Sequence, residues 1–163
     1  MIDGLTPWMN DKVAELLSFA SRSGIDARVV STRRSCAQQN AIYESAPGVA
    51  TQARGCQSWH VWGRAVDLSV DGPLEDYAVL GDKWKRMGGV WGGDFKGIDD
   101  FGHFEWHPGL KIEDVCQGAA DCPDPTEPWP DDRPFFALPS VRLVGGAVLA
   151  GVGVVLASRV LSK

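Results

Sequence analysis

The chain lacks any run of lysine and arginine of the length that nucleic-acid binding favours. Its 16 basic residues are outnumbered by 21 acidic ones, which gives a formal net charge of −5. A protein that neutralises phosphate groups needs a concentrated basic surface. Nucleic acid is therefore not an expected partner. Histidine is also scarce, with only three in 163 residues.

The amino terminus lacks both the basic start and the apolar core of a secretory signal peptide. Residues 1–7 are Met-Ile-Asp-Gly-Leu-Thr-Pro. Export by a cleaved leader is therefore not expected, and a phage or prophage origin is consistent with this sequence.

The cysteines lack the Cys-x-x-Cys spacing of structural zinc sites, so zinc binding by cysteine is not expected. Four cysteines allow three disulfide pairings. The order of the expected elements favours Cys36 with Cys56, because that bridge would tie together the two flanks of a cleft. The alternative is that all four are free thiols, since disulfides are uncommon in the cytosol. The four are Cys36, Cys56, Cys116 and Cys122.

Helix and strand signals alternate through the first two thirds of the chain. Thr6 followed by Pro7 predicts the start of a helix, whose apolar residues recur on one face until Gly24. This order of elements favours an α+β domain with a small antiparallel sheet and packed helices. Strands are expected at 28–32, 65–70 and 103–106, and further helices at 35–45, after a Ser35 cap, and at 73–87.

Composition divides the chain into a catalytic-size domain at residues 1–120, a linker at 121–140 and an apolar segment at 141–163. The linker contains six of the ten prolines and five acidic residues. Such a segment buries little and is expected to form an extended, semi-rigid spacer.

The apolar segment predicts a C-terminal helix that contacts a membrane. Residues 143–158 carry no charge and lie between Arg142 and Arg159. A helix of this length spans about 24 Å, against a hydrocarbon core of about 30 Å, so the flanking residues would complete the span. The alternative is a soluble apolar helix. Four glycines favour the membrane, because they allow close packing there and form helices poorly in water.

All three histidines lie in or beside two short segments. A catalytic zinc ion takes three nitrogen or oxygen ligands and leaves a position for water, which a nearby carboxylate deprotonates. The candidate ligands are His60, Asp67 and His103, and the candidate base is Asp100. The segments are Ser58-Trp59-His60-Val61-Trp62-Gly63-Arg64-Ala65-Val66-Asp67 and Asp100-Phe101-Gly102-His103-Phe104, with His107 shortly after.

These segments resemble a family of zinc peptidases that includes D-Ala-D-Ala carboxypeptidases and dipeptidases and the L-alanyl-D-glutamate endopeptidases of phage endolysins. The family pattern is Ser-x-His, then Gly-x-Ala-x-Asp, and later an acidic residue three positions before a second histidine; all are present in order. Upstream, the run Ser31-Thr32-Arg33-Arg34-Ser35 resembles the family's Arg-Ser segment, and Gln39, Ile42 and Tyr43 resemble its following helix. The resemblance covers roughly residues 1–110.

The resemblance implies a hedgehog/D-Ala-D-Ala peptidase-like fold with a zinc cleft, in which His60, Asp67 and His103 bind Zn²⁺. It implies that Asp100 accepts a proton from the attacking water and donates it to the leaving amine. It also implies that Arg34 polarises the scissile carbonyl and stabilises the oxyanion. Arg33 is the competing arginine.

The residues in and around these segments also have alternative roles. Glu105 and His107 offer a rival register with His107 as the ligand, but they are two residues apart rather than three; a supporting role outside the ligand set is the other alternative for either. Ordinary polar roles for the two motif histidines are disfavoured, because every histidine of the chain lies in these motifs. Ser58 is expected as a hydrogen-bonding neighbour of the site or substrate, and a plain loop serine is the alternative. The nearby tryptophans are expected as packing residues.

The resemblance implies a zinc metallopeptidase that hydrolyses peptidoglycan stem peptides. Asp-x-x-His, rather than Glu-x-x-His, is closer to the endolysin-type enzymes of cell-wall degradation, so the L-Ala-D-Glu bond is the first expected substrate. The alternatives are a D-Ala-D-Ala carboxypeptidase of wall maturation and a non-catalytic, zinc-containing wall-binding module; Asp100 and Arg34 argue against the module. We expect membrane association through the C-terminal segment, with action on the cell wall or periplasm.

Overall fold

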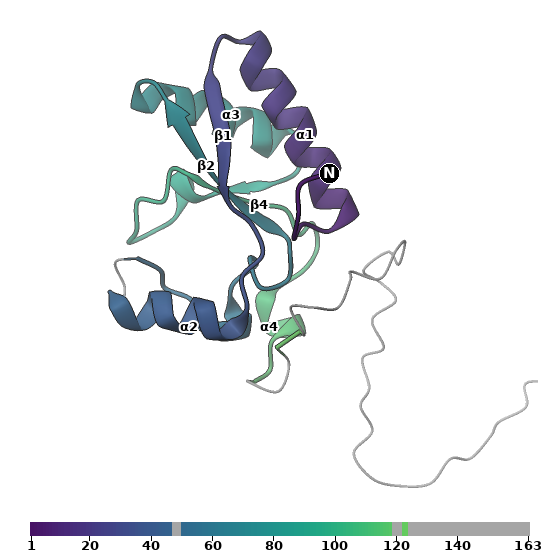
Figure 1. Cartoon of the computed structure of the whole chain (residues 1–163), viewed down its shortest axis with the longest axis vertical. Helices are drawn as coiled ribbons and strands as arrows, with labels where there is room; N and C mark the ends of the chain where they lie inside the picture. Colours follow the sequence, from purple (N-terminus) through teal and green to yellow (C-terminus); the bar gives the residue numbers. More distant parts are fainter. Residues whose placement is uncertain (47–49, 119–121, 124–163) are drawn as a thin grey trace, which may run out of the picture. The chain divides into compact units, whose positions relative to one another are not determined.

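A computed structural model of the chain describes residues 1–46, 50–118 and 122–123. The strands in these residues form one antiparallel sheet in the order β1-β2-β4-β3 (Figure 1). An α+β fold with a small antiparallel sheet and packed helices, as predicted from the sequence, is therefore confirmed. The strands are β1 (Asp26–Ser31), β2 (Ala65–Asp71), β3 (Val90–Trp91) and β4 (His103–Glu105).

Helix α1 (Pro7–Arg22) begins where the sequence predicts it. The Thr6 side chain accepts a hydrogen bond from the backbone N–H of Met9, and Pro7 occupies the first helical position, where no intrahelical donor is needed. The apolar residues of one face, including Val13 and Leu16, are fully buried. Burial of this face fixes the helix against the sheet.

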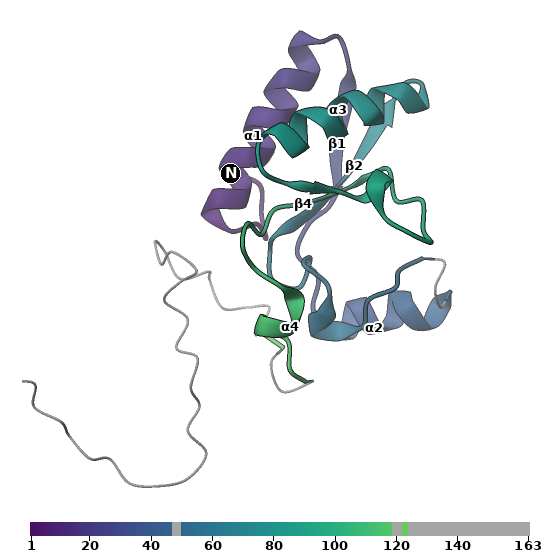
Figure 2. The same ribbon diagram turned by 180° about the vertical axis from the view of Figure 1, so that it is seen from behind.

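The hydrophobic core lies between the sheet and the pair α1 and α3 (Leu74–Arg86), which lie side by side (Figures 1 and 2). Alternate residues of a strand point to opposite faces. Val66 and Leu68 of β2 therefore enter the core with Phe104 of β4, whereas Asp67 faces the other side. The sheet thus separates a packed face from a polar one.

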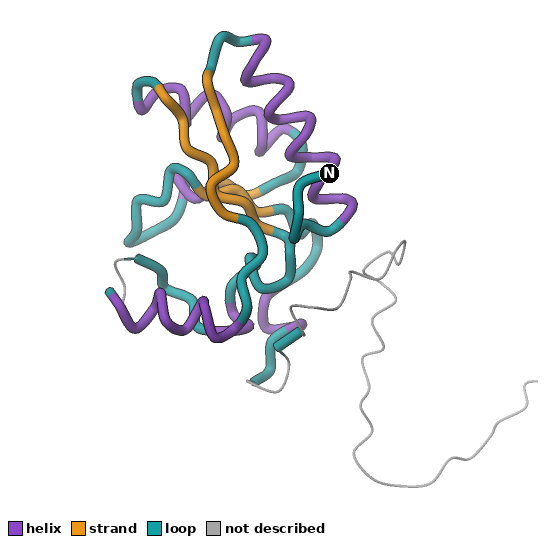
Figure 3. The backbone as a smooth tube through the Cα atoms, viewed as in Figure 1, coloured by secondary structure: helices purple, strands orange, loops and turns teal. Residues whose placement is uncertain are grey.

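Helix α2 (Cys36–Ser45) lies away from α1 and α3, toward the opposite end of the described domain (Figure 1). Its start is fixed by a capping box: Ser35 Oγ accepts from the N–H of Gln38, and the Gln38 side chain accepts from the N–H of Ser35. Loops make up much of the chain between α2 and the sheet (Figure 3). They contain the short 3-10 helices η1 (Gly55–Gln57) and η2 (Gly92–Asp94), and α4 (Ile112–Val115) follows β4.

Two disulfides join the end of the described chain to the α2 region. Cys36 pairs with Cys122, and Cys56 pairs with Cys116, with Cα atoms 6.0 and 5.4 Å apart. The expected Cys36–Cys56 pair is therefore wrong, and so is the alternative of four free thiols. Cys36 and Cys56 lie on the two flanks of the cleft, but each is bonded to a cysteine from the end of the described chain. In the fold, the segment after α4 returns past η1 and supplies both partners.

The predicted C-terminal helix at 141–163 and most of the predicted linker at 121–140 lie outside the described residues. Within the described part of the chain, no helix has the length and apolar character needed to cross a bilayer. The membrane helix stays a prediction from the sequence.

Candidate active site

A tight turn presents His60 to the polar side of the sheet. The N–H of Val61 donates to the carbonyl of Ser58, and the N–H of Gly63 donates to the carbonyl of His60, at 3.0 and 3.1 Å. Gly63 has φ of 62°, a left-handed conformation that favours glycine. Its carbonyl accepts a hydrogen bond from Thr6, which fixes the turn to the start of α1. His60 is consequently almost completely buried, at 1% exposure.

Sheet register brings Ser31, Asp67 and His103 into one row across three strands. Asp67 of β2 pairs with Ser31 of β1 on one side and with His103 of β4 on the other. Directly opposed residues have their side chains close together on the same face. The 36 positions that separate Asp67 from His103 in the sequence are therefore closed by strand pairing.

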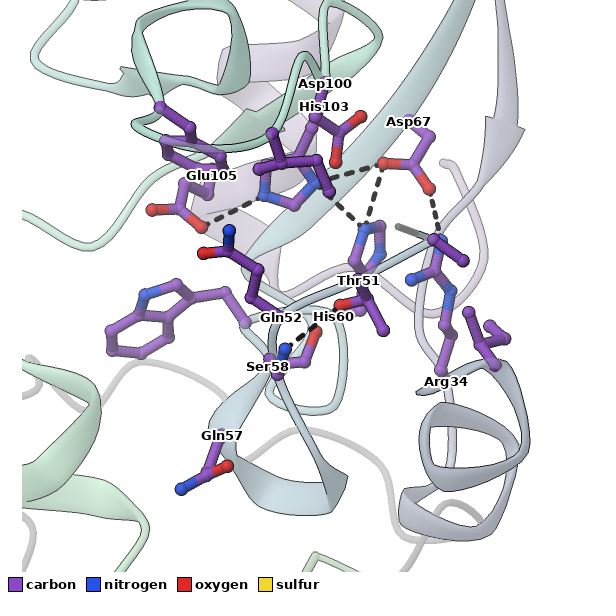
Figure 4. Close-up of a pocket in the computed structure, with 16 residues that line it drawn as sticks. Arg34, Thr51, Gln52, Gln57, Ser58, His60, Asp67, Asp100, His103 and Glu105 are labelled. Atoms are coloured by element: carbon purple, nitrogen blue, oxygen red, sulfur yellow. Dashed lines mark hydrogen bonds and ion pairs between the residues drawn. The ribbon is translucent and has the colours of Figure 1, made fainter. Parts of the chain in front are cut away.

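The three predicted ligands converge on a single point (Figure 4). Asp67 Oδ1 lies 3.0 Å from His60 Nε2 and 3.1 Å from His103 Nδ1, and the two nitrogens are 3.2 Å apart. One donor atom from each of the three residues lies within 4.8 Å of the others. This group could hold a metal ion.

Outer contacts orient both histidine rings. The Nδ1–H of His60 donates to the carbonyl of Thr32 at 2.6 Å, which turns Nε2 toward Asp67. His103 Nε2 lies 3.0 Å from Oε2 of Glu105, which leaves Nδ1 for the cluster. A metal-binding histidine usually has its second nitrogen fixed in this way by a carbonyl or carboxylate.

Burial and hydrogen bonds determine the charges of the cluster. Burial lowers the pKa of His60 despite its hydrogen bond to Asp67, and so favours the neutral ring that binds metals. Burial alone would raise the pKa of Asp67, but the hydrogen bond from His103 and the contact with His60 outweigh it and hold the pKa well below its usual range. The carboxylate therefore stays ionised.

His103 and Glu105 form a second, coupled pair. Burial alone would lower the pKa of His103, but hydrogen bonds to Asp67 and Glu105 raise it to about 9. Burial alone would raise the pKa of Glu105, but hydrogen bonds from His103 and His107 outweigh it and lower the pKa to about 2. Without a metal ion, His103 therefore carries a proton between two carboxylates. Metal binding would displace that proton.

These residues fit a zinc ion. Two imidazole nitrogens and a carboxylate oxygen are a ligand set that zinc uses at catalytic sites, where one position stays open for water. The outer contacts from Thr32 and Glu105 orient both rings for that task.

Asp100 lies in the same pocket as the cluster, whereas adjacent Asp99 is exposed (Figure 4). Its backbone carbonyl accepts a hydrogen bond from the N–H of His103 at 3.1 Å, so a tight turn fixes it beside that ligand. Burial raises the pKa of Asp100 above its usual value, and the nearby charge of Asp67 adds to the effect. A carboxyl group with a raised pKa is suited to accept and return a proton.

Arg34, and not Arg33, lines the pocket. Its Nη2 forms an ion pair with Asp67 Oδ2 and also donates to Ser31 Oγ at 2.9 Å, while Nη1 donates to Gln39 Oε1 at 3.2 Å. Gln39 is fully buried and is itself held by Thr51 and the carbonyl of Ala53. The guanidinium is thus held rigidly beside the candidate metal ligand.

The pocket is lined on its other sides by α2, the loop before η1 and the loop after η2. The predicted neighbour Ser58 lies in it. His107 is not among the converging ligands; it contacts Glu105 instead, so the rival register is not the one that the fold assembles. The lining residues are Arg34, Ile42, Ala50, Thr51, Gln52, Ala53, Gln57, Ser58, Trp59, His60, Asp67, Phe95, Ile98, Asp100, His103 and Glu105.

Sequence reasoning missed the supports of this site. Ser31 and Thr32 lie in the segment that resembles the family's Arg-Ser segment, but the contacts of the Ser31 Oγ and of the Thr32 carbonyl with the site were not predicted. Gly92 was also missed: a Cβ atom there would clash with the carbonyl of Asp100 and lie 2.9 Å from Cβ of His103. A glycine in a loop that approaches a motif is a signal of such close packing, but its partner is visible only in the fold.

Comparison with known proteins agrees with the fold and the motif. The peptidoglycan L-alanyl-D-glutamate endopeptidase CwlK of Bacillus subtilis is 27% identical over 124 residues, which cover 64% of this chain and 74% of the relative. No family model matches the sequence. The solved L-Ala D-Glu endopeptidase ChiX of Serratia marcescens has a TM-score of 0.50 and 23% identity, and covers 64% of this chain and 81% of its own. The chain is thus similar in sequence to an L-alanyl-D-glutamate endopeptidase and in fold to ChiX.

The solved LD-carboxypeptidase LdcB also matches, with a TM-score of 0.51 and 20% identity over 71% of this chain and 70% of its own. At this identity the likeness is one of fold. The residues that carry the family motif in this chain are those that the fold brings into one pocket.

Proposed function

We propose that this chain is a zinc-dependent peptidase that hydrolyses stem-peptide bonds of peptidoglycan. The observation that carries the proposal is the meeting of His60, Asp67, His103 and the half-buried Asp100 in one pocket. A purely structural metal site has no use for a free carboxylate beside it. This argues for hydrolysis over a non-catalytic binding module.

In the proposed reaction, His60, Asp67 and His103 would hold a zinc ion, which would supply Lewis-acid chemistry for the water and the scissile carbonyl. Asp100 takes a proton from the attacking water at its carboxylate and later donates it to the leaving amine. Its raised pKa makes the carboxylate a stronger base for the first step, while the acid form is still far more acidic than the protonated amine that it produces in the second.

Arg34 is proposed to stabilise the oxyanion. Four of its five N–H groups are engaged among the described residues: Nε and Nη2 contact Ser31, Nη2 also contacts Asp67, and Nη1 contacts Gln39. One N–H of Nη1 remains for a substrate oxygen. A cation already held by three residues needs little reorganisation when charge develops.

We propose the L-Ala-D-Glu bond as the substrate. The sequence relative CwlK is named as an L-alanyl-D-glutamate endopeptidase. The short Asp-x-x-His motif of this chain, which places Asp100 beside His103, favours the same bond. Removal of a terminal D-Ala, the activity of a carboxypeptidase, is the second candidate; the likeness of fold to LdcB favours it.

Substitution of Asp100 tests the proposed base. Asp100→Ala should lower the rate of peptidoglycan hydrolysis by at least about 100-fold, the usual range for loss of a general base, while zinc content measured by atomic emission stays at the wild-type level. Asp99→Ala is the matched control, because Asp99 is exposed; it should retain the full rate. An Asp100→Ala enzyme with unchanged activity would show that the base is another group.

A further inference from the structure

Glu105 lies between two histidines, and only one of them belongs to the metal cluster. Its Oε2 accepts from His103 Nε2 at 3.0 Å, and its Oε1 accepts from His107 Nε2 at 2.9 Å. Glu105 is buried, at 9% exposure. A buried carboxylate with one oxygen on each ring is fixed at both ends, so its orientation depends on both histidines.

His107 is itself held on two sides. Its Nδ1 lies 3.1 Å from the carbonyl oxygen of Leu110, so both ring nitrogens face oxygen acceptors. The flat face of the ring stacks on Trp59, with centroids 4.2 Å apart and planes 10° from parallel. Trp59 is buried and directly precedes His60 in the turn that presents this ligand. The His107 ring therefore touches both ligand-bearing segments of the chain.

We propose that His107 is a positioning residue for the metal site, which orients Glu105 and thereby His103. The stack of the His107 ring on Trp59 places it against the turn that carries His60. The inference rests on the proposed function only in taking zinc as the bound ion. It explains why a histidine outside the ligand set lies in the same short segment, and why the Asp100–His103 motif is followed by the pair Glu105 and His107.

Zinc affinity should therefore depend on the hydrogen bond from His107 to Glu105 and not on the stack of His107 on Trp59. If the N–H that His107 donates is removed, Glu105 keeps an unpaired buried oxygen and is free to turn away from His103. Loss of a partner outside the ligand set typically lowers metal affinity by roughly 10–100-fold. If only the aromatic face is removed and a donor is kept at the same position, Glu105 retains both partners.

The experiment compares His107→Phe with His107→Gln in the full chain. Phenylalanine keeps the stack on Trp59 without the donor; glutamine keeps an amide N–H near the position of Nε2 without the ring. The readout is the zinc dissociation constant, measured by competition with a chromophoric chelator. We expect affinity to fall by roughly tenfold or more in His107→Phe and to be largely restored in His107→Gln.

A structural role alone is excluded by two further measurements. The melting temperature of each metal-free variant reports folding. Tyr77→Phe is the control, because it removes a partly buried hydrogen bond, away from the site, that the Tyr77 hydroxyl accepts from the N–H of Val70. Tyr77→Phe should lower stability without changing zinc affinity. In a Glu105→Ala background, His107→Phe should cause no additional loss of affinity, since His107 acts through Glu105.

Wild-type zinc affinity in His107→Phe would overturn the inference, as would a loss that persists in the Glu105→Ala background. These outcomes are distinct from failure of the proposed function, which would appear as wild-type protein that binds zinc and releases no peptidoglycan fragments.

Discussion

His103 carries the proton that a metal ion must displace. Hydrogen bonds to Asp67 and Glu105 raise its pKa to about 9 in the metal-free protein. Below that pH the ring is protonated, so metal binding releases a proton and becomes weaker as the pH falls. Above it, no proton is released from this ring and the dependence ends.

The apparent zinc affinity should therefore rise by as much as about tenfold per pH unit up to about pH 9 and then level off. Chelator competition across pH 6 to pH 10 at constant ionic strength measures this directly. An affinity that does not change across this range would mean that His103 is already neutral in the metal-free protein.

Gly92 is a residue whose side chain the site has no room for. A methyl group there would clash with the carbonyl of Asp100 and crowd Cβ of His103. Because a shift of about 1 Å in a catalytic group can cost roughly 100-fold in rate, Gly92→Ala should slow hydrolysis strongly. Gly118→Ala, where an added Cβ meets nothing within 4 Å, is the control and should retain the wild-type rate.

The residues that the sequence identified are those whose spacing is itself informative. His60 and Asp67 lie on one turn-and-strand unit, and Asp100 and His103 on one tight turn, so local geometry limits where they can point. The Thr32 carbonyl and the Glu105–His107 contact were not assigned, because each depends on which segments meet in space. Backbone acceptors leave no trace in a sequence motif.

At the scale of elements, α2 is held by different forces from those that hold α1 and α3. Among the described residues, the hydrophobic core contains none from α2, whose only buried residue is Gln39. The disulfides Cys36–Cys122 and Cys56–Cys116 link α2 and η1 to the returning chain. In the chain-entropy account, a disulfide that joins cysteines 60 or 86 positions apart stabilises the folded state by about 4 kcal/mol. The pocket wall therefore depends on the disulfides.

Reduction by a dithiol, which adds two electrons and two protons to each disulfide, should loosen this wall and leave the core intact. We expect hydrolysis to fall, and hydrogen exchange to accelerate in α2 and η1 while α1 and β2 keep their protection. Paired Cys36→Ser and Cys122→Ser substitutions should reproduce the effect on α2. Equal loss of protection in all elements would show that the disulfides support the whole fold instead.

The elements that the sequence predicted begin with local signals. Thr6 with Pro7, and Ser35 with Gln38, are caps that act within one helical turn. The helices α1 and α2 begin at these caps, as predicted. Strand β3, two residues long, was not predicted, because it is defined by pairing with β4 rather than by a pattern of its own. The predicted Cys36–Cys56 disulfide was wrong for a related reason, because the pairing depends on the path of the chain after β4, which is a non-local feature.

At the scale of the whole molecule, the sheet divides packing from chemistry. One face of β2 and β4 enters the core through Val66 and Phe104, and the other carries Asp67 and His103. Alternation along each strand therefore produces a site mounted on a rigid support. The polar face needs α2 and its loops to complete the pocket.

The C-terminal segment supplies a further prediction, which rests on the sequence alone. Residues 143–158 carry no charge, so we propose that residues 141–163 hold the enzyme at a membrane. Deletion of 141–163 should move the protein from the membrane fraction to the soluble fraction of expressing cells, because the apolar surface is removed. An unchanged distribution would rule out this role. Peptidoglycan hydrolysis by the shortened protein provides the control for folding.

The most direct test of the account is mass spectrometry of the fragments that the full chain releases from purified peptidoglycan, with zinc and after removal of metal. The account predicts new amino termini on D-Glu that appear only with zinc. Release of terminal D-Ala alone would instead assign a carboxypeptidase. The absence of any fragment from zinc-loaded protein would contradict the proposal that this site catalyses hydrolysis.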